Sequence, residues 1–457
     1  MDKITVTNFR CFQEKQTARL APLTLLVGEN STGKTSLMAM IRSLWDVAFS
    51  SRITDFKKDP YDLGSFDDIA HHRGGRAGRA ASFEAGFEIG PRAPKNKKGP
   101  VEHIDKPFQF EATFTKRGTV PIPTTLRLTQ NGLWVETILQ DEFWTISFGT
   151  PNGEWSSEDS SKLLEPIEED YSAVFTSLFI LQFLQMHYRE GKIKLKSLKG
   201  LKSPTDSDME QINKFAHTHL FSPINNPKKH PFASAPVRSK PHRTYDPADT
   251  SRDPGGDYIP MYLASVFFQK TKKWSALKDA LDRFGQDSGL FDEISVKPLG
   301  GKDSGPFQVQ IRKAGNRAKG PNRNLIDVGY GVSQVLPVIT ELLREDTPPM
   351  YLLQQPEVHL HPSAQAALGT LFCQVATIDQ QLIVETHSDF LLDRVRMEIR
   401  DGTSPLKPED VSILFFERND LDVRIHSLEL DNNGNILNVP ETYRRFFLTE
   451  TQRSLGL

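Results

Sequence analysis

The chain has 457 residues, of which 56 are Lys or Arg and 58 are Asp or Glu, so its formal net charge at pH 7 is −2. This length allows two or three domains, and a hydrophobic fraction of 37% is sufficient for a sizeable core. The near-neutral balance excludes an obligatory polycation, although it leaves local basic patches open.

The first 50 residues predict a strand–loop–helix unit. Residues 4–6 and 23–27 are short apolar strands, and the second of them runs into a glycine-rich loop. A helix is expected over residues 34–49, because apolar side chains recur there at helical spacing.

From residue 83 the hydrophobic period changes to two. Residues 83–89 and 108–114 each alternate apolar and polar side chains, which is typical of strands with one buried face. Asn131-Gly132 separates the similar runs 125–129 and 133–136, and both residue types tolerate the positive φ of a tight hairpin. These features predict an antiparallel β layer.

The middle of the chain predicts helices around an insertion. Residues 165–200 and 260–284 are expected to be helical, and residues 202–257, rich in Pro, Ser, Asp and Lys, are expected to be loop-rich. The polar stretch 90–106 is expected to be an exposed loop. Residues 228–243 are locally basic, so contact with DNA phosphates is an alternative to a solvated surface. The basic residues are Lys228, Lys229, His230, Arg238, Lys240, His242 and Arg243.

The last third returns to α/β alternation. Helices are expected at 332–343, 363–378 and 390–400, alternating with strands at 351–353, 382–384 and 413–416. Short apolar strands between helices indicate a parallel sheet covered on both faces. The expected fold class is therefore α/β, with an antiparallel β layer and a helical, loop-rich insertion.

Cysteine content and hydropathy bear on the compartment. Cys11 and Cys373 are the two cysteines, too few for a disulfide framework or a Cys-only zinc site, which favours a reducing compartment. No apolar run approaches the roughly 18–20 residues that span a bilayer, and the first residues lack the apolar segment of a signal peptide. We therefore expect a cytoplasmic protein without a membrane partner.

Residues 28–35, Gly-Glu-Asn-Ser-Thr-Gly-Lys-Thr, match the phosphate-binding P-loop pattern in full. The glycines let successive backbone N–H groups point into one concavity at a helix N-terminus, where phosphates bind. Lys34 is expected to reach the β- and γ-phosphates, and the Thr35 hydroxyl to join a Mg²⁺ shell. The predicted nucleotide-binding residues are Gly28, Glu29, Asn30, Ser31, Thr32, Gly33, Lys34, Thr35 and Ser36.

Further motifs carry a resemblance to a known family. Residues 4–12, Ile-Thr-Val-Thr-Asn-Phe-Arg-Cys-Phe, precede the P-loop closely and resemble the head of RecF/SMC/OLD-type ATPases. Residues 327–334 resemble the signature motif of that family. Residues 351–362 resemble its Walker B strand running into the D-loop, and residues 385–388 resemble its switch segment with a histidine. The order of the motifs matches the family, and the closest resemblance is to OLD-like AAA-type ATPases associated with phage defence.

The resemblance implies an ABC-type fold that binds ATP and Mg²⁺ in a composite site. ATP at one P-loop would be capped by Gly331, Ser333 and Gln334 of a second copy, so a homodimer or higher homo-oligomer is expected. It also implies an N-terminal ATPase lobe at 1–160, an insertion at 161–300 and a C-terminal ATPase lobe at 301–457. The expected partner is a separately encoded effector, a nuclease or a toxin.

The Walker B segment departs from the family pattern. Gln354 and Gln355 stand where the family has an Asp for the Mg²⁺ shell and a Glu that activates water. A neutral amide takes no proton from water, so base catalysis is expected to be weak. Three interpretations stay open: slow hydrolysis with ATP as a clamp or timer, substitution by Glu357, Glu385 or His387, or an engineered Gln355 that traps the ATP state. We favour slow hydrolysis, with Gln355, Glu357 and His387 as candidate catalytic residues and Gln354 beside Thr35 as a candidate Mg²⁺ ligand.

Other kinds of site are less well supported by the sequence. Glu357, His359 and His361 alternate, so an extended segment there would present them to one metal, but the resemblance gives the simpler interpretation of a D-loop. Residues 413–420 resemble an acidic strand of a Toprim nuclease only faintly, and the length after them is too short for that domain. Three functions stay open: an ATPase that controls an effector, a RecF-type DNA-maintenance ATPase, and a scaffold with structural ATP.

Overall fold

The computed structural model describes residues 1–49, 54–75, 78–90, 106–140, 143–157, 188, 194–218, 230–247, 250–300, 305–314 and 320–443. The chain divides into two compact units whose segments interleave along the sequence. Unit 1 comprises Met1–Leu20, Ser31–His230 and Glu417–Ile425, and unit 2 comprises Ala21–Asn30, Pro231–Phe416 and His426–Leu457. The division falls inside the glycine-rich loop. The domain boundaries expected at residues 160 and 300 stay a prediction.

Unit 1 is built on a nine-stranded sheet in the order β10-β9-β8-β7-β6-β5-β4-β1-β2, antiparallel at every pairing. Its strands are β1 (Lys3–Thr7), β2 (Gln16–Arg19), β4 (Ser82–Ile89), β5 (Phe108–Arg117), β6 (Val120–Gln130), β7 (Leu133–Gln140), β8 (Phe143–Thr150), β9 (Gly153–Ser157) and β10 (Leu195–Gly200). The predicted antiparallel β layer is confirmed.

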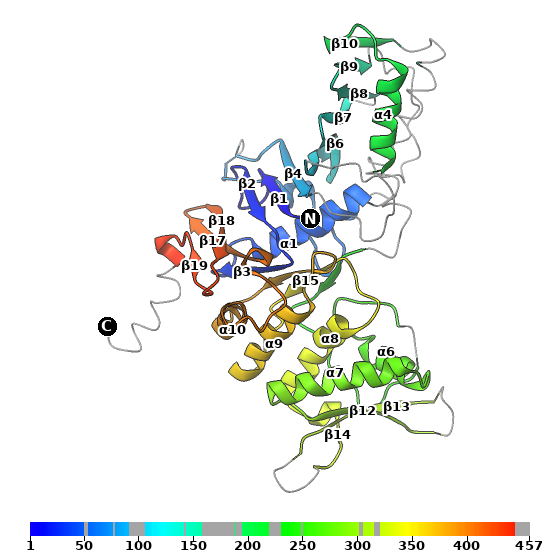
Figure 1. Ribbon diagram of the computed structural model, residues 1–457, viewed down its shortest axis with the longest axis vertical. Coiled ribbons are helices and arrows are strands. Elements are labelled where there is room, and N and C mark those ends of the chain that lie inside the picture. Colours follow the sequence, from blue (N-terminus) through cyan, green and yellow to red (C-terminus); the bar gives the residue numbers. More distant parts are fainter. Residues whose placement is uncertain are drawn as a thin grey trace. The chain divides into compact units, whose positions relative to one another are not determined.

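The alternating pattern of the sheet explains its core. Phe83 and Phe114, opposite each other on β4 and β5, are fully buried, and their rings stack with centroids 4.7 Å apart. Asn131 and Gly132 have φ of +51° and +81°, as the predicted hairpin requires. Helices α1 (Lys34–Phe49), α2 (Phe66–Ile69) and α4 (Asp206–Ala216) belong to the same unit, and α4 packs beside β7 and β8 (Figure 1).

One prediction for the middle of the chain was wrong, and two were incomplete. Residues 195–200, expected in a helix, form β10, because they pair as an edge strand with β9. The loop-rich region 202–257 contains α4, which begins at a capping box formed by Thr205 and Asp208, and strand β11 (Phe232–Ser234). Residues 260–284 are helical as predicted, in two helices separated where Lys270 has φ of +52°. Residues 165–187 and 189–193 of the predicted helix and 91–105 of the predicted loop lie outside the described residues.

Unit 2 is built on a seven-stranded sheet in the order β11-β15-β16-β3-β17-β18-β19. The strands from β11 to β17 pair in parallel, as predicted, and β18 pairs with β19 antiparallel. The strands other than β11 are β3 (Leu23–Gly28), β15 (Met350–Gln354), β16 (Gln381–Glu385), β17 (Val411–Asn419), β18 (Asp422–Leu430) and β19 (Ile436–Leu437). Every residue of β3, β15 and β16 is buried, which is typical of central parallel strands.

Helices and a small second sheet surround the parallel sheet of unit 2. The helices are α6 (Ile259–Phe268), α7 (Lys272–Ser288), α8 (Tyr330–Leu343), α9 (Pro362–Val375) and α10 (Asp389–Arg400). Figure 1 shows α9 and α10 side by side, and α7 running along the sheet formed by β12 (Glu293–Pro298), β13 (Phe307–Arg312) and β14 (Arg323–Asn324). The predicted fold class is therefore confirmed. Within the described residues, no helix combines the length and apolar character needed to cross a bilayer.

Candidate functional site

Three neighbouring parallel strands of unit 2 end at one edge of the sheet. Leu26 on β3 lies opposite Glu385 on β16, and Glu385 lies opposite Gln354 on β15. Gly28 ends β3 two residues after Leu26. The carboxyl ends of parallel strands are where open α/β sheets bind ligands. The fold thus brings the start of the P-loop, the switch segment and the Walker B segment together, although they lie in opposite halves of the chain.

The glycine-rich loop turns through positive backbone angles. φ is +140° at Gly28, +60° at Ser31 and +88° at Gly33. At Gly28 an added Cβ would lie 2.7 Å from the carbonyl oxygen of Phe416 on β17, so a side chain does not fit there. Lys34 and Thr35 begin α1, where Lys34 is buried and Thr35 is exposed. Backbone N–H groups at such a helix start suit an anion.

The N-terminal motif packs against the second half of the loop within unit 1. An added Cβ at Gly33 would lie 2.5 Å from Cys11 Sγ and 2.8 Å from the Phe12 ring. Arg10 Nη1 donates to Ser36 Oγ at 3.0 Å, and Arg418 donates to the carbonyl oxygen of Ser31. These contacts hold Ser31, Gly33 and Ser36, and the side chains of Glu29, Asn30 and Ser31 are exposed.

Two of these supporting residues were not assigned a role from the sequence. Arg10 belongs to the motif that carries the family resemblance, so its position beside the P-loop gave a signal. Arg418 gave none, because its contact depends on β17 lying next to β3. Burial raises the pKa of the Cys11 thiol to about 11, so the thiol that packs against Gly33 stays protonated at neutral pH.

Glu357 is a buried carboxylate just after β15. Its side chain Oε1 accepts hydrogen bonds from the Thr386 hydroxyl and the His387 backbone N–H, each at 2.8 Å. Burial raises the pKa of this carboxyl, and the hydrogen bonds together with the charge of Arg238 partly offset that rise. Oε2 is buried and has no partner in the described part of the chain. Glu357 therefore joins the Walker B segment to the switch segment and keeps one oxygen available.

The two glutamines and His387 differ in their surroundings. Gln354 is buried, and its Nε2 has no partner among the described residues. Gln355 is half-buried with φ of +40°, and its N–H donates to the Glu385 carbonyl at 2.9 Å. The His387 side chain is exposed. The amide oxygen of Gln354 and the hydroxyl of Thr35 are hard oxygen donors of the kind that Mg²⁺ prefers.

The signature segment begins helix α8. Ser333 is buried, and its Oγ donates to the Tyr330 carbonyl at 2.9 Å. An added Cβ at Gly331 would lie 2.7 Å from the His359 carbonyl oxygen, so glycine permits the D-loop to approach. Tyr330 is 42% exposed, and its ring lies edge-on to the exposed His359 with centroids 4.8 Å apart. The signature segment and the D-loop therefore present one continuous exposed surface.

The D-loop is a turn and not an extended segment. Glu357 is buried, whereas His359 and His361 are exposed. The Nδ1 of His361 accepts the backbone N–H of Ala364 at 3.3 Å and so caps α9. The three side chains face different surroundings. In the residues that the structure describes, no three His, Cys, Asp or Glu side chains gather in a group able to hold a metal ion.

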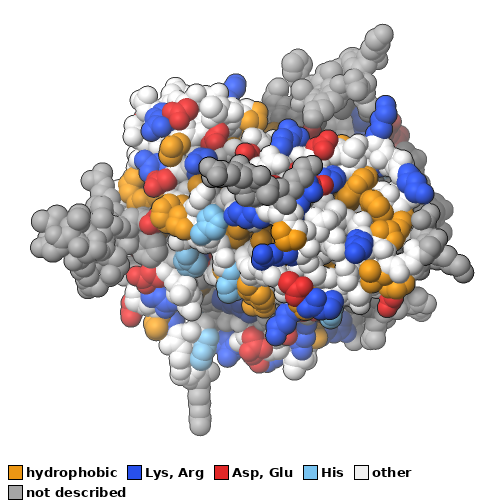
Figure 2. Space-filling view, turned by 90° about the horizontal axis from the view of Figure 1, so that it is seen from below, with side chains coloured by type: hydrophobic (Ala, Val, Ile, Leu, Met, Phe, Trp, Pro, Cys, Tyr) orange, Lys and Arg blue, Asp and Glu red, His pale blue; other side chains and the backbone are white. Residues whose placement is uncertain are grey.

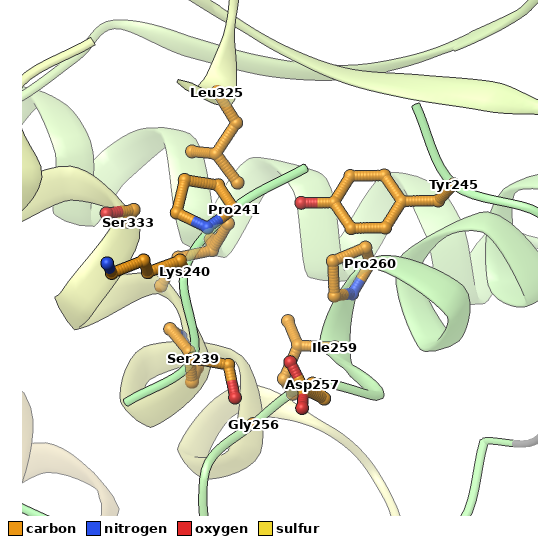
Figure 3. Close-up of a pocket in the computed structure, with 12 residues that line it drawn as sticks. Ser239, Lys240, Pro241, Tyr245, Gly256, Asp257, Ile259, Pro260, Leu325 and Ser333 are labelled. Atoms are coloured by element: carbon orange, nitrogen blue, oxygen red, sulfur yellow. The ribbon is translucent and has the colours of Figure 1, made fainter. Parts of the chain in front are cut away.

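A solvent-open hollow lies beside the signature helix. Figure 3 shows Ser333 of α8 at its wall, with Lys240 and Tyr245 from the segment after β11 and Asp257 from the residues before α6. Lys240 and Asp257 are exposed, and their opposite charges leave the hollow without a single electrostatic character. The hollow therefore adds no ligand class of its own to the site.

The predicted basic segment contains buried, paired and exposed basic residues. Arg238 is 2% exposed, and Arg243 forms a two-bond ion pair with Asp327 at 2.9 and 2.6 Å. Lys240 and His242 are exposed, and residues 228–229 lie outside the described residues. Figure 2 shows Lys and Arg side chains scattered among hydrophobic and acidic ones on the face it draws. This arrangement gives little support to DNA contact through the segment.

Family models match both ends of the chain. Residues 1–73 match the model described as "AAA ATPase domain", and residues 203–393 match "AAA domain, putative AbiEii toxin, Type IV TA system". Residues 406–443 match "Protein of unknown function (DUF3696)". The AAA matches cover the P-loop and the signature, Walker B and switch segments. They support an ATP-binding, P-loop ATPase.

Solved structures with a likeness to the chain include SMC heads. The Smc head domain with a coiled coil and joint from Pyrococcus yayanosii is 10% identical, with 99% of each chain covered and a TM-score of 0.43. The head with an extended coiled coil bound to the C-terminal domain of ScpA from Pyrococcus furiosus is 11% identical, with 99% of each covered and a TM-score of 0.41. The SMC head domain from Thermotoga maritima is 11% identical, covering 94% of this chain and 99% of that one, with a TM-score of 0.35. Curated proteins gave no match.

Proposed function

We propose that the chain is the ATPase subunit of a two-part system in which ATP-driven pairing of two copies controls a separate effector, a nuclease or a toxin, in defence against phage. The observation that carries the proposal is the shared sheet edge at which β3, β16 and β15 end. The match at 203–393 to a model named for a toxin of a toxin–antitoxin system supports the defence role. Cys11 and Cys373 are free thiols, which supports a cytoplasmic location.

The P-loop supplies the binding energy for ATP. Backbone N–H groups of residues 28–35 bind the phosphate oxygens, and the charge of Lys34 offsets that of the β- and γ-phosphates. The Thr35 hydroxyl and the Gln354 amide oxygen would hold Mg²⁺, which when bound supplies charge neutralisation to the phosphates.

Glu357 is the carboxylate that we assign to water activation. A water oxygen attacks the γ-phosphorus, the bond to the β–γ bridging oxygen breaks, ADP leaves with that oxygen, and the water proton passes to Glu357 Oε2. Oε1 is held by Thr386 and His387, so Oε2 is the oxygen left to accept the proton. Slow turnover follows, because the amides of Gln354 and Gln355 take no proton.

A second copy completes the site in this proposal. The exposed surface formed by Tyr330 and His359 lies next to Ser333, at the positive end of the α8 dipole. Burial of an aromatic pair at the centre of an interface is a common source of affinity. The γ-phosphate of the partner's ATP would then meet the N-terminus of α8.

The experiment compares oligomeric state and turnover. Light scattering after gel filtration should show dimers with Mg·ATP for the wild type and monomers for Lys34→Ala and for Ser333→Arg. Ser333→Arg should still bind ATP, which separates loss of pairing from loss of binding. Wild-type monomers at saturating ATP would refute the composite site. Turnover of Gln355→Glu should exceed wild type by at least about tenfold, the scale of one added catalytic group, and no gain would favour a scaffold with structural ATP.

A further inference from the structure

A buried arginine lies between the signature helix and the end of the Walker B strand within unit 2. Arg238 follows β11, the strand that pairs with β15, and is 2% exposed. Its Nη2 donates to the carbonyl oxygens of Gln354 at 3.1 Å and Gln355 at 3.4 Å. The Gln334 amide on α8 accepts the Arg238 backbone N–H at 3.2 Å and donates to its carbonyl at 3.3 Å. Arg238 is therefore anchored on both elements.

Burial of this guanidinium needs a compensating interaction. Taking a charge out of water is unfavourable unless it is paired and hydrogen-bonded. The two carbonyl contacts satisfy Nη2, whereas Nε and Nη1 are buried without a partner in the described part of the chain. Burial lowers the pKa of Arg238 to about 10 and the Glu357 carboxylate opposes that fall, so the side chain is charged at neutral pH.

Glu357 is the acidic residue that follows the two glutamines contacted by Arg238. No acid stands at positions 354 or 355, and Glu357 Oε2 is itself buried without a described partner. Arg238 is the charge that lowers the pKa of this carboxyl, while Thr386 and His387 act on it through hydrogen bonds. The other ionisable residues in these segments are Glu385 and His387, in the switch segment, and His359 and His361, in the residues that follow Glu357.

We infer that Arg238 is a positioning residue for hydrolysis: its charge prepares Glu357 to accept a proton, and its two anchors couple the Walker B end to the signature helix. The inference rests on the proposed function. Gln334 joins α8 to Arg238, because both hydrogen bonds of its side-chain amide are made with the Arg238 backbone. Movement of α8 on pairing would therefore reach the carbonyls of Gln354 and Gln355 through one side chain.

Three substitutions separate charge from shape. Arg238→Lys keeps the positive charge and loses the planar guanidinium that donates to two carbonyl oxygens. Arg238→Gln keeps N–H donors and loses the charge, and Arg238→Met loses the charge and the donors. The first measurement is the titration of the Glu357 carboxyl by ¹³C NMR in protein labelled at glutamate Cδ, without nucleotide, with the signal assigned by Glu357→Gln. We expect the pKa of Glu357 to rise in the Gln and Met variants and to stay near the wild-type value in the Lys variant.

The second measurement is the pH profile of kcat together with the Kd for ATP. Each unit of rise in the pKa of Glu357 lowers the ionised fraction on the acid limb about tenfold. We expect the acid limb of the charge-free variants to move to higher pH, while Kd stays within about threefold of wild type because the P-loop is intact. A purely structural role would lower kcat without moving the limb. If Arg238→Met does not fold by circular dichroism, Arg238→Gln carries the comparison.

The outcomes are distinguishable. An unmoved titration of Glu357 in folded Arg238→Gln overturns the inference, and so does an Arg238→Lys protein that behaves like the charge-free variants. A wild-type chain that binds ATP and shows no turnover overturns the proposed role of Glu357, whereas a shifted NMR titration in that case still establishes that Arg238 controls its charge.

Discussion

Replacing Gly33 with alanine tests how the P-loop is held. Gly33 has φ of +88°, and an added Cβ would lie 2.5 Å from Cys11 Sγ and 2.8 Å from the Phe12 ring. The positive φ costs a residue with a side chain about 1–2 kcal/mol, and overpacking a filled site costs about 1–3 kcal/mol more. We therefore expect the free energy of unfolding to fall by about 2–5 kcal/mol in Gly33→Ala, the sum of these two costs.

Gly74→Ala is the matched control within the same unit. Gly74 has φ of +90°, and nothing lies within 4 Å of its added Cβ, so the backbone cost applies alone. Urea titrations of both variants, followed by circular dichroism, should place Gly33→Ala below Gly74→Ala by about 1–3 kcal/mol, the overpacking cost. Adding Cys11→Ala to Gly33→Ala removes the nearest atom and should restore part of the loss.

Nucleotide binding gives the second readout of the same substitution. Displacement of the loop should weaken ATP binding in Gly33→Ala and leave it unchanged in Gly74→Ala. Equal stability losses in the two glycine variants, with ATP binding unchanged in both, would refute the packing of the N-terminal motif against the P-loop.

Three further predictions concern buried carboxylates. Burial raises the pKa of Asp208, but hydrogen bonds from Thr205, Thr150 and Asn152 outweigh burial and lower this pKa from 3.8 to about 2. The ionised carboxylate therefore adds about 2 kcal/mol to the free energy of unfolding above pH 3.8, and this contribution is lost as the pH falls towards 2. Urea titration at pH 7 should find Asp208→Asn less stable by about the same 2 kcal/mol. Equal stability there would contradict this origin. The pKa of Glu357 is raised above 4.5, so its folded form holds the proton more tightly and the free energy of unfolding should decrease as the pH rises above 4.5. Glu357→Gln should flatten that decrease, and parallel profiles would show that another group causes it. Glu341 is 1% exposed, accepts a hydrogen bond from the buried Tyr258 hydroxyl and pairs with Arg252 and Arg344, so Glu341→Ala leaves that hydroxyl without this partner and should cost about 1–3 kcal/mol in the same urea assay. A loss below about 1 kcal/mol, the scale of a surface pair, would contradict the burial.

The sheet that carries the site could be predicted because its strands are unusual in sequence. Residues 351–353 and 382–384 are wholly apolar and lie between helical patterns. This combination is typical of central parallel strands. Strand β10 could not be recognised, because its exposed lysines give no apolar face to an edge strand. Helix α4 did leave a signal, the Thr205–Asp208 capping box, that the polar composition of its surroundings obscured.

The supporting arginines mark the limit of sequence reasoning at the site. Arg238 stands in a run of basic residues that is typical of a solvated surface, yet it is buried. Its burial depends on Gln334, 96 residues away, and on the carbonyls of Gln354 and Gln355 beyond that. Charge patterning describes composition along the chain, whereas burial is decided by which strands become neighbours. The P-loop needed no such information, because its glycines, lysine and helix are contiguous.

The most direct measurement is ATP binding by isothermal titration calorimetry in Mg²⁺, with the wild type and Lys34→Ala in parallel. The wild type should bind one ATP per chain, and Lys34→Ala should bind at least about tenfold more weakly, a loss of about 1.4 kcal/mol or more. Circular dichroism should show that Lys34→Ala is folded. Equal affinities for the two proteins, or no binding by the wild type, would contradict a nucleotide site at residues 28–35.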